Sequence, residues 1–126
     1  MKPFLSIAFA LVAVSATAMP QRVADREATN ADLKCLVVSA VAAGSSDPTV
    51  SKGGTIAAVY WIGRIDGQDP NYDLEGAIVA LAQSMKPDDF RSEGQRCGAI
   101  LQARGKALQD LGARLQGIVS EPPKAS

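Results

Sequence analysis

The stretch Pro87–Val119 restricts the fold most, because its apolar residues keep helical spacing from one end to the other. After Phe90, the candidates for an inward face recur at alternating steps of four and three residues, which places them on one face of an α-helix. These positions are Gly94, Cys97, Leu101, Arg104, Leu108, Leu111, Leu115 and Ile118. The pattern predicts a long C-terminal helix whose seam packs against the rest of the chain.

Three glycines lie beside this seam at intervals of seven residues: Gly98, Gly105 and Gly112. A glycine in a helix interior costs about 1 kcal/mol relative to alanine. We therefore expect a compensating contact, in which the glycine row forms a groove for the backbone of a neighbouring helix. A kink near Gly105 is the alternative.

The first 18 residues have the composition of a cleavable secretory signal peptide. Lys2 supplies the positive charge, the apolar run Phe4–Val14 is too short to span a bilayer, and Ala16 and Ala18 provide the small residues of a cleavage site. No cysteine follows the cleavage site, and no later segment is apolar for long enough to cross a membrane. We expect a soluble mature chain, without stable membrane insertion, that is periplasmic or secreted.

Composition excludes several classes of function. Loss of Lys2 with the signal leaves 12 basic and 13 acidic residues without a basic cluster, which argues against nucleic-acid binding. The chain has no histidine, the commonest general base and metal ligand. Its serines have no identifiable base, and Asp88 with Asp89 suits the first turn of a helix better than acid–base catalysis. The sequence predicts no enzyme, cofactor or metal site.

The two cysteines, Cys35 and Cys97, allow one intramolecular disulfide, and an oxidising compartment favours it. In the chain-entropy description, closing a loop of about 60 residues stabilises a fold by roughly 4 kcal/mol. A redox-active or metal-binding thiol pair is the alternative. A redox pair typically has C-x-x-C spacing, however, and a metal site would need further ligands.

Local signals predict four helices. Residues 19–29 are polar and predict a flexible arm. Asn30 is a candidate N-cap for a first helix over residues 31–43, which is apolar nearly all round and ends at Gly44. Asp47 and Pro48 have the residue types of an N-cap and a first helical position, and they predict a second helix that ends at Gly67. Its β-branched content leaves a strand as the alternative.

Asp73 predicts the start of a third helix, and Lys86 with Pro87 marks the break before the fourth. Residues 120–126 contain two consecutive prolines and predict a disordered tail. We expect one domain over residues 30–119, an all-α, four-helix bundle-like fold with short loops and antiparallel neighbours. Its ends would be joined by the Cys35–Cys97 bond.

The segment around the only tryptophan is the strongest candidate for an interaction surface, because Trp, Tyr and Arg are frequent anchors of interfaces. Its candidate residues are Tyr60, Trp61, Arg64 and Asp66. The alternative is that Trp61 fills the core and that Arg64 forms an exposed ion pair with Asp66.

An export signal, a cysteine in the first helix, another in the last, and an aromatic-x-x-glycine step at Tyr60–Gly63 form a pattern similar to the HdeA-type periplasmic acid-stress chaperones. The spacing of Cys35 and Cys97 is longer here than in that family, and the helices after Asp66 show no matching motif. The resemblance implies a disulfide-stapled periplasmic helical fold and is compatible with a role in holding unfolded proteins.

Two functional hypotheses follow. In the first, the chain is a non-enzymatic exported protein that binds unfolded or envelope proteins, or itself, during envelope stress. In the second, it is a carrier that holds a small apolar ligand in a cavity between helices. Apolar patches exposed under stress would favour the first, and a preformed closed cavity would favour the second.

Overall fold

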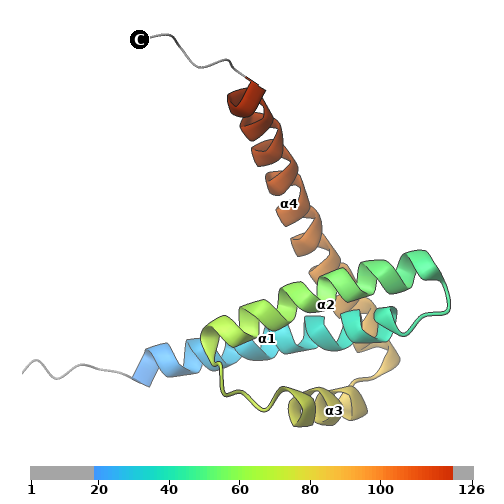
Figure 1. The fold of residues 1–126 in the computed structure, drawn as a ribbon. Helices are drawn as coiled ribbons and strands as arrows, with labels where there is room; N and C mark the ends of the chain where they lie inside the picture. The colour runs from blue at the N-terminus through green and yellow to red at the C-terminus, as the bar shows by residue number, and fades with distance from the viewer. Residues whose placement is uncertain (1–18, 121–126) are drawn as a thin grey trace, which may run out of the picture.

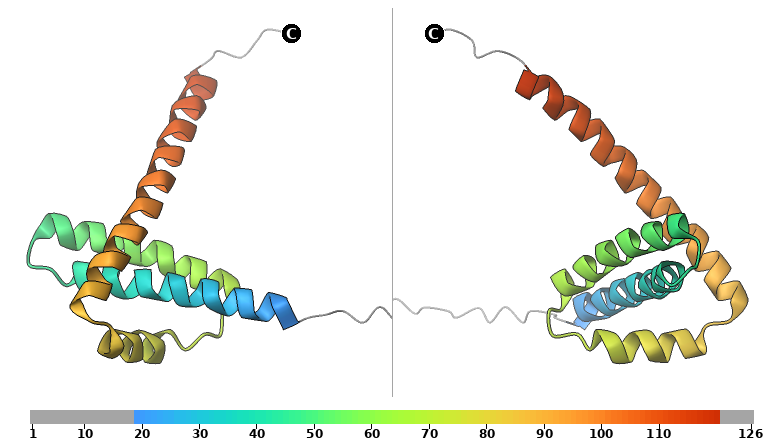
Figure 2. Two further views of the ribbon diagram at one scale, coloured as in Figure 1. Left: turned by 180° about the vertical axis from the view of Figure 1, so that it is seen from behind. Right: turned by 45° about the vertical axis from the view of Figure 1, so that its right-hand side comes forward.

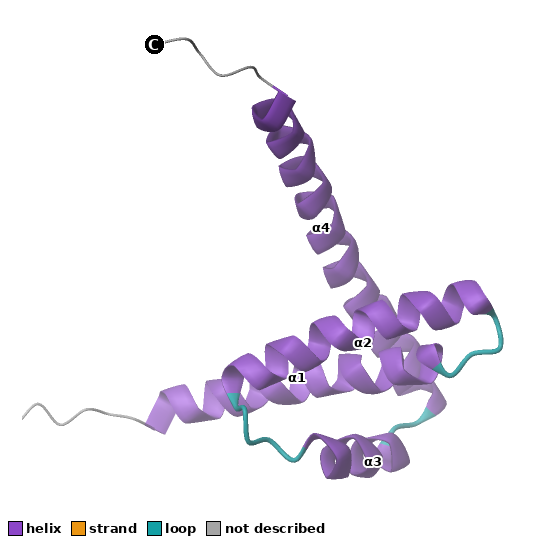
Figure 3. Cartoon of the chain, viewed as in Figure 1, coloured by secondary structure: helices purple, strands orange, loops and turns teal. Residues whose placement is uncertain are grey.

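A computed structural model describes residues 19–120 as four helices joined by short loops (Figure 3). They are α1 (Met19–Ala43), α2 (Pro48–Gln68), α3 (Leu74–Ser84) and α4 (Pro87–Ser120). Within that range there is no strand, so the all-α prediction is confirmed, including helix over the β-branched part of α2. The predicted signal peptide and residues 121–126 of the predicted tail lie outside the described range.

The central element of the fold is α1, which packs against each of the other three helices and most extensively against α2. The short loop after Gly44 turns the chain back, so that α1 and α2 form an antiparallel hairpin (Figure 1). The third helix lies along the other side of α1, and the first half of α4 crosses the hairpin (Figure 2). The result is a small helical body organised around α1.

Predicted caps set two of the helix starts. Asp47 accepts hydrogen bonds from the backbone N–H groups of Thr49 (2.8 Å) and Val50 (3.2 Å), with Pro48 at the first helical position. Asp73 accepts one from the N–H of Gly76 at 3.2 Å. Each carboxylate satisfies an N–H group that has no partner within its own helix.

The start of α1 differs from the prediction, because residues 19–29 belong to the helix and are not a separate flexible arm. Pro20 is the only helix breaker in this segment, and it lies in the first turn, where its missing N–H has no cost. Asn30 is therefore an interior residue of α1 and not its N-cap. At the same end of the hairpin, α2 continues through Gly67 to Gln68.

The core forms where α1, α2 and α4 meet. Its buried members are Leu33, Cys35, Leu36, Trp61, Ile65 and Cys97. Half-buried side chains of α3, among them Ile78 and Leu81, pack against this cluster. Because α1 is apolar over most of its circumference in this region, it can bury side chains against three neighbours at once.

The tightest helix contact lies between α1 and α2 at Gly54. A Cβ at this position would lie 2.6 Å from the backbone carbon of Ala42 and 2.8 Å from the carbonyl oxygen of Ser39. It would meet the backbone nitrogen of Ala43 closer still. Only glycine allows the two backbones to approach this closely.

The course of α4 corrects the prediction of a seam that faces inward along its whole length. Cys97 is buried and Leu101 half-buried, but residues 102–120 project beyond the body (Figures 1 and 2). We call this segment the α4 arm. It spans about 28 Å at 1.5 Å per residue.

The glycine row also behaves differently from the prediction. A Cβ at Gly98, Gly105 or Gly112 would meet no atom within 4 Å among the described residues, apart from its own helix and chain neighbours. The predicted intramolecular groove is therefore wrong. The helix is not interrupted at Gly105, since α4 continues from Pro87 to Ser120.

Between Met19 and Ser120, none of the helices combines the length and the hydropathy needed to span a bilayer.

Candidate protein-interaction surface

The α4 arm exposes a row of large apolar side chains that we call the arm stripe: Leu108, Leu111, Leu115 and Ile118. Their exposed fractions are 70%, 43%, 49% and 69%, and the neighbouring Val119 is 84% exposed. The spacing i, i+3, i+7, i+10 places the four on one face of the helix. Scattered single exposed apolar residues are normal, but a contiguous row on a projecting element marks an interaction site.

The remaining circumference of the arm is polar. Gln102, Gln109 and Gln116 are exposed and recur every seven residues outside the arm stripe. Lys106 donates to both carboxylate oxygens of Asp110, at 3.1 and 3.2 Å, in a pair typical of a solvated helix face. The arm is thus an amphipathic helix whose apolar face has no partner among residues 19–120.

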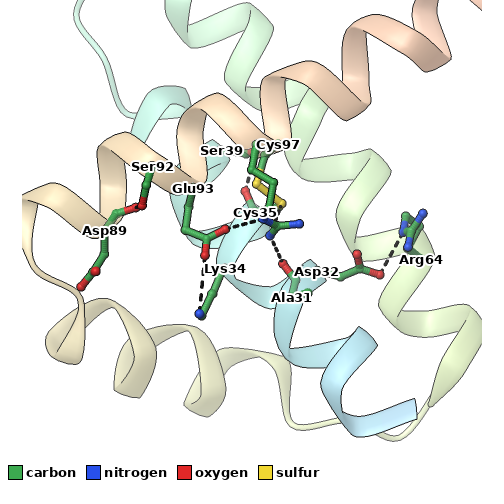
Figure 4. Close-up of a disulfide and its surroundings, with 11 residues drawn as sticks. Ala31, Asp32, Lys34, Cys35, Ser39, Arg64, Asp89, Ser92, Glu93 and Cys97 are labelled. Carbon is green, nitrogen blue, oxygen red and sulfur yellow. Dashed lines mark hydrogen bonds and ion pairs between the residues drawn. A yellow bond between two sulfur atoms is a disulfide. The ribbon is translucent and has the colours of Figure 1, made fainter. Parts of the chain in front are cut away.

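The base of the arm is fixed to the body by the predicted Cys35–Cys97 disulfide, which the structure confirms (Figure 4). The two Cα atoms lie 5.5 Å apart, and both cysteines are buried. Arg96 adds a second link, because its Nη2 donates to the carbonyl oxygen of Ala31 at 2.8 Å and to Sγ of Cys35 at 3.1 Å. These bonds join α4 to α1 just before the arm begins.

Glu93 completes this junction. Its carboxylate accepts a hydrogen bond from Nε of Arg96 at 2.7 Å and lies 3.5 Å from Nζ of Lys34 on α1 (Figure 4). The donor atoms of Cys35, Glu93 and Cys97 lie within 4.8 Å of one another, a spacing that could suit a metal ion. Here, however, the sulfurs are bonded to each other and the carboxylate is paired with two cations. The cluster is a structural joint between helices.

The predicted surface around Tyr60 is not brought together as one exposed patch. Trp61 is fully buried in the core, as the alternative interpretation held, so it cannot serve as an anchor in the folded chain. Its ring packs edge-on against Tyr60, with the ring centroids 4.8 Å apart. Asp66 is exposed and Tyr60 half-buried, so a contact role for these two stays a prediction.

Arg64 pairs with Asp32 of α1, and the suggested exposed pair with Asp66 does not form. Its Nε lies 2.9 Å from Oδ2 of Asp32, which also accepts a hydrogen bond from Gln68 at 3.1 Å. The guanidinium lies 5.6 Å from the centroid of Trp61 and shields one of its faces. The hydrogen bond to Asp32, and then the one to Tyr60, raises the pKa of Arg64 above its usual range. This group therefore joins α1 to α2.

Sequence reasoning missed Asp32, Arg96 and the special position of Gly54. Asp32 is the only acidic residue between Asn30 and Gly44, in a mostly apolar segment, and that isolation was an available signal. No sequence signal identified the contacts of Arg96 with α1, because Cys35 and Ala31 lie 61 and 65 residues away.

A hollow between the start of α1 and the loop after α2 does not favour an apolar ligand. Its volume is about 950 Å³. Apart from Tyr72, its lining consists of polar and charged residues: Asp25, Arg26, Thr29, Asn30, Gln68 and Asp69. A site for an apolar ligand is instead concave and lined mainly by hydrophobic side chains.

Comparison of the chain with protein-family models, with curated proteins and with solved structures finds no match.

Proposed function

We propose that this protein is an exported, non-enzymatic protein that uses the arm stripe to bind apolar segments of other polypeptides. The observation that carries the proposal is the unpartnered stripe on an arm whose base is fixed by a disulfide. The disulfide is compatible with an oxidising compartment, which together with the signal-like N-terminus supports a periplasmic or extracellular location.

The stripe has the geometry of a helix that binds into an apolar groove or against an apolar segment. Anchors at i, i+3, i+7 and i+10 are the spacing by which amphipathic helices are recognised. Full burial of a Leu or Ile side chain contributes about 1.5–3 kcal/mol, and these side chains are roughly half to two-thirds exposed in the free chain. Four of them therefore supply roughly 3–7 kcal/mol, a favourable term comparable to the lower estimates of the cost of association. Binding should be weak and readily reversible, as holding an unfolded protein requires.

The resemblance to acid-stress chaperones adds a condition under which such binding would matter. Model carboxyl groups titrate near pH 4, so the mature chain loses most of its negative charge below about pH 3 while its 12 basic residues stay charged. Mutual repulsion then loosens a small helical body, and the disulfide limits its expansion. More apolar surface becomes available beside the arm stripe at the pH at which envelope proteins unfold.

The test compares two double variants of the arm. Leu111→Lys with Leu115→Lys places two charges in the stripe that persist from pH 7 to about pH 2, and the matched control, Gln109→Lys with Gln116→Lys, places the same charges on the polar face. Both sets of sites are exposed enough for the fold to persist, which circular dichroism checks. Light scattering then follows the aggregation of an acid-labile second protein at pH 7 and during a cycle to about pH 2 and back.

We expect wild type and control to suppress aggregation and the stripe variant to lose most of that protection. Equal protection by the stripe variant would show that the arm does not bind the client. Lack of protection by the wild type at every pH would contradict the proposed function itself.

A further inference from the structure

We infer that a second copy of this chain covers the arm stripe, with two α4 arms packed antiparallel about a two-fold axis. This goes beyond the proposed function, since it concerns the state of the stripe when no client is bound. It also stands or falls independently of client binding.

The arm is self-complementary in one antiparallel register. Two rows with seven-residue spacing make up its apolar face, one through Leu101, Leu108 and Leu115 and the other through Arg104, Leu111 and Ile118. Aligning Leu108 with Leu111 of the second copy also aligns Leu101 with Ile118 and Arg104 with Leu115. Large side chains then meet large ones in each layer, as knobs-into-holes packing requires.

The glycine row supports the same register. When Leu108 faces Leu111 of the second copy, Gly105 lies beside Gly112 of that copy, and the two-fold axis repeats the contact on the other side. Since a Cβ at Gly105 or Gly112 would touch nothing within 4 Å in its own body, these positions are free for the close approach of another backbone. Such an approach compensates for the helix propensity that each glycine loses.

The length of the arm fits this pairing. The register places the two-fold axis between residues 109 and 110, close to the middle of the projecting segment 102–120. The six paired positions run from the half-buried Leu101, at the base of the arm, to Ile118 near its tip, so the contact uses nearly the whole arm. The tip of each arm then reaches the base of the other, where Leu101 packs against the core, and the two bodies lie at opposite ends of the helix pair.

Charge favours the antiparallel over the parallel arrangement. In a parallel pair, Arg104 would face Arg104 of the second copy inside the apolar seam, where like charges repel and are costly to desolvate. In the antiparallel register the two arginines are offset by 11 residues, which is about 16 Å along the helices. That distance exceeds the screening length of about 8 Å at physiological salt.

The available area predicts a weak dimer. At about 60–120 Å² for each large apolar side chain, the exposed parts of the arm stripe and Val119 supply roughly 200–400 Å² per copy. A standard stable interface buries about 800 Å² per partner. The arms alone therefore support a dimer with a dissociation constant on the order of micromolar or weaker.

Two cysteine variants test both the contact and its register. Arg104→Cys and Leu115→Cys are prepared separately, and each is oxidised alone and in an equal mixture in a glutathione buffer. The native cysteines are buried, and their disulfide remains intact. A mixture of Gln102→Cys with Leu115→Cys is the control, because Gln102 lies on the polar face. Intact mass under non-reducing conditions identifies the covalent dimers.

We expect the mixture of Arg104→Cys and Leu115→Cys to yield the mixed dimer at least tenfold above either variant alone and above the control mixture. Efficient self-linking of each single variant would indicate a parallel pair and overturn the proposed register. Sedimentation velocity from about 1 to 300 µM, a range that brackets weak association, provides the second measurement. Wild type and Gln109→Glu should dimerise across it, and Leu111→Glu should associate at least tenfold more weakly.

A wild-type chain that stays monomeric throughout this range overturns the inference. Client protection by that monomer would leave the proposed function standing. A dimer that fails to protect any client would support this inference and contradict the other.

Discussion

Replacing Gly54 with alanine should separate the α1–α2 hairpin, although alanine is the better helix former. The new Cβ would overlap backbone atoms of Ala42 and Ala43 and the carbonyl oxygen of Ser39, none of which can rotate away as a side chain could. Overpacking of a well-packed contact costs about 1–3 kcal/mol, and a backbone obstacle places this case at the upper end. Higher helix propensity returns about 1 kcal/mol, so the expected net loss is about 2 kcal/mol.

Gly53→Ala is the matched control, because the same substitution one residue earlier in α2 meets nothing within 4 Å. It should stabilise the chain by up to about 1 kcal/mol. A change of 1 kcal/mol shifts the melting temperature of a domain of 60–100 residues by roughly 4–8 °C. Thermal melts at low protein concentration should therefore place Gly54→Ala roughly 8–16 °C below wild type and Gly53→Ala above it. If Gly54→Ala melts at or above Gly53→Ala, the close approach of the two helices is wrong.

Three further perturbations address other contacts. Replacing both Cys35 and Cys97 with alanine should lower the free energy of unfolding in urea by about 4 kcal/mol, given a sequence separation of 62, and an unchanged value would contradict that role for the bond. Asp32→Asn should lower the free energy of unfolding by about 1–2 kcal/mol. This is less than for a fully buried ion pair, because the Arg64 side chain is 38% exposed. Because the pKa of Arg64 is raised in the folded chain, the ion pair contributes its full stabilisation below the pKa that Arg64 has in the unfolded chain. That stabilisation is lost only as the pH rises through the pKa of the folded chain. The melting temperature should therefore show no loss of this ion pair between pH 7 and 10. Gly105→Ala should increase helicity and stabilise the monomer by up to about 1 kcal/mol. A variant that is less stable than wild type at low protein concentration would show that Gly105 packs against another helix of its own chain.

The features predicted correctly from the sequence depend on residues close together in the chain or on the number of cysteines. Asp47 and Asp73 were identified as helix starts because a cap acts on N–H groups two or three residues away. The pairing of Cys35 with Cys97 followed from there being only two cysteines.

The sequence alone could not show which face of a helix packs against the rest of the chain. Gly53 and Gly54 are equivalent in the sequence, yet only Gly54 faces α1. The heptad pattern of α4 has the same appearance whether its partner belongs to the same chain or to another, so it could not reveal that the seam leaves the body after Leu101. Asp32 and Arg64 lie 32 residues apart, and no local rule joins them.

The central position of α1 has a consequence for the order in which the protein assembles. α1 and α2 are adjacent in the chain and can form their hairpin as soon as both have emerged, because only a short loop has to close. The contact of α1 with α4 must wait until Cys97 has emerged, 62 residues after its partner. Until then, one side of α1 and the thiol of Cys35 remain uncovered. The disulfide therefore forms late, and in a newly made chain its presence shows that the base of the arm has packed against α1.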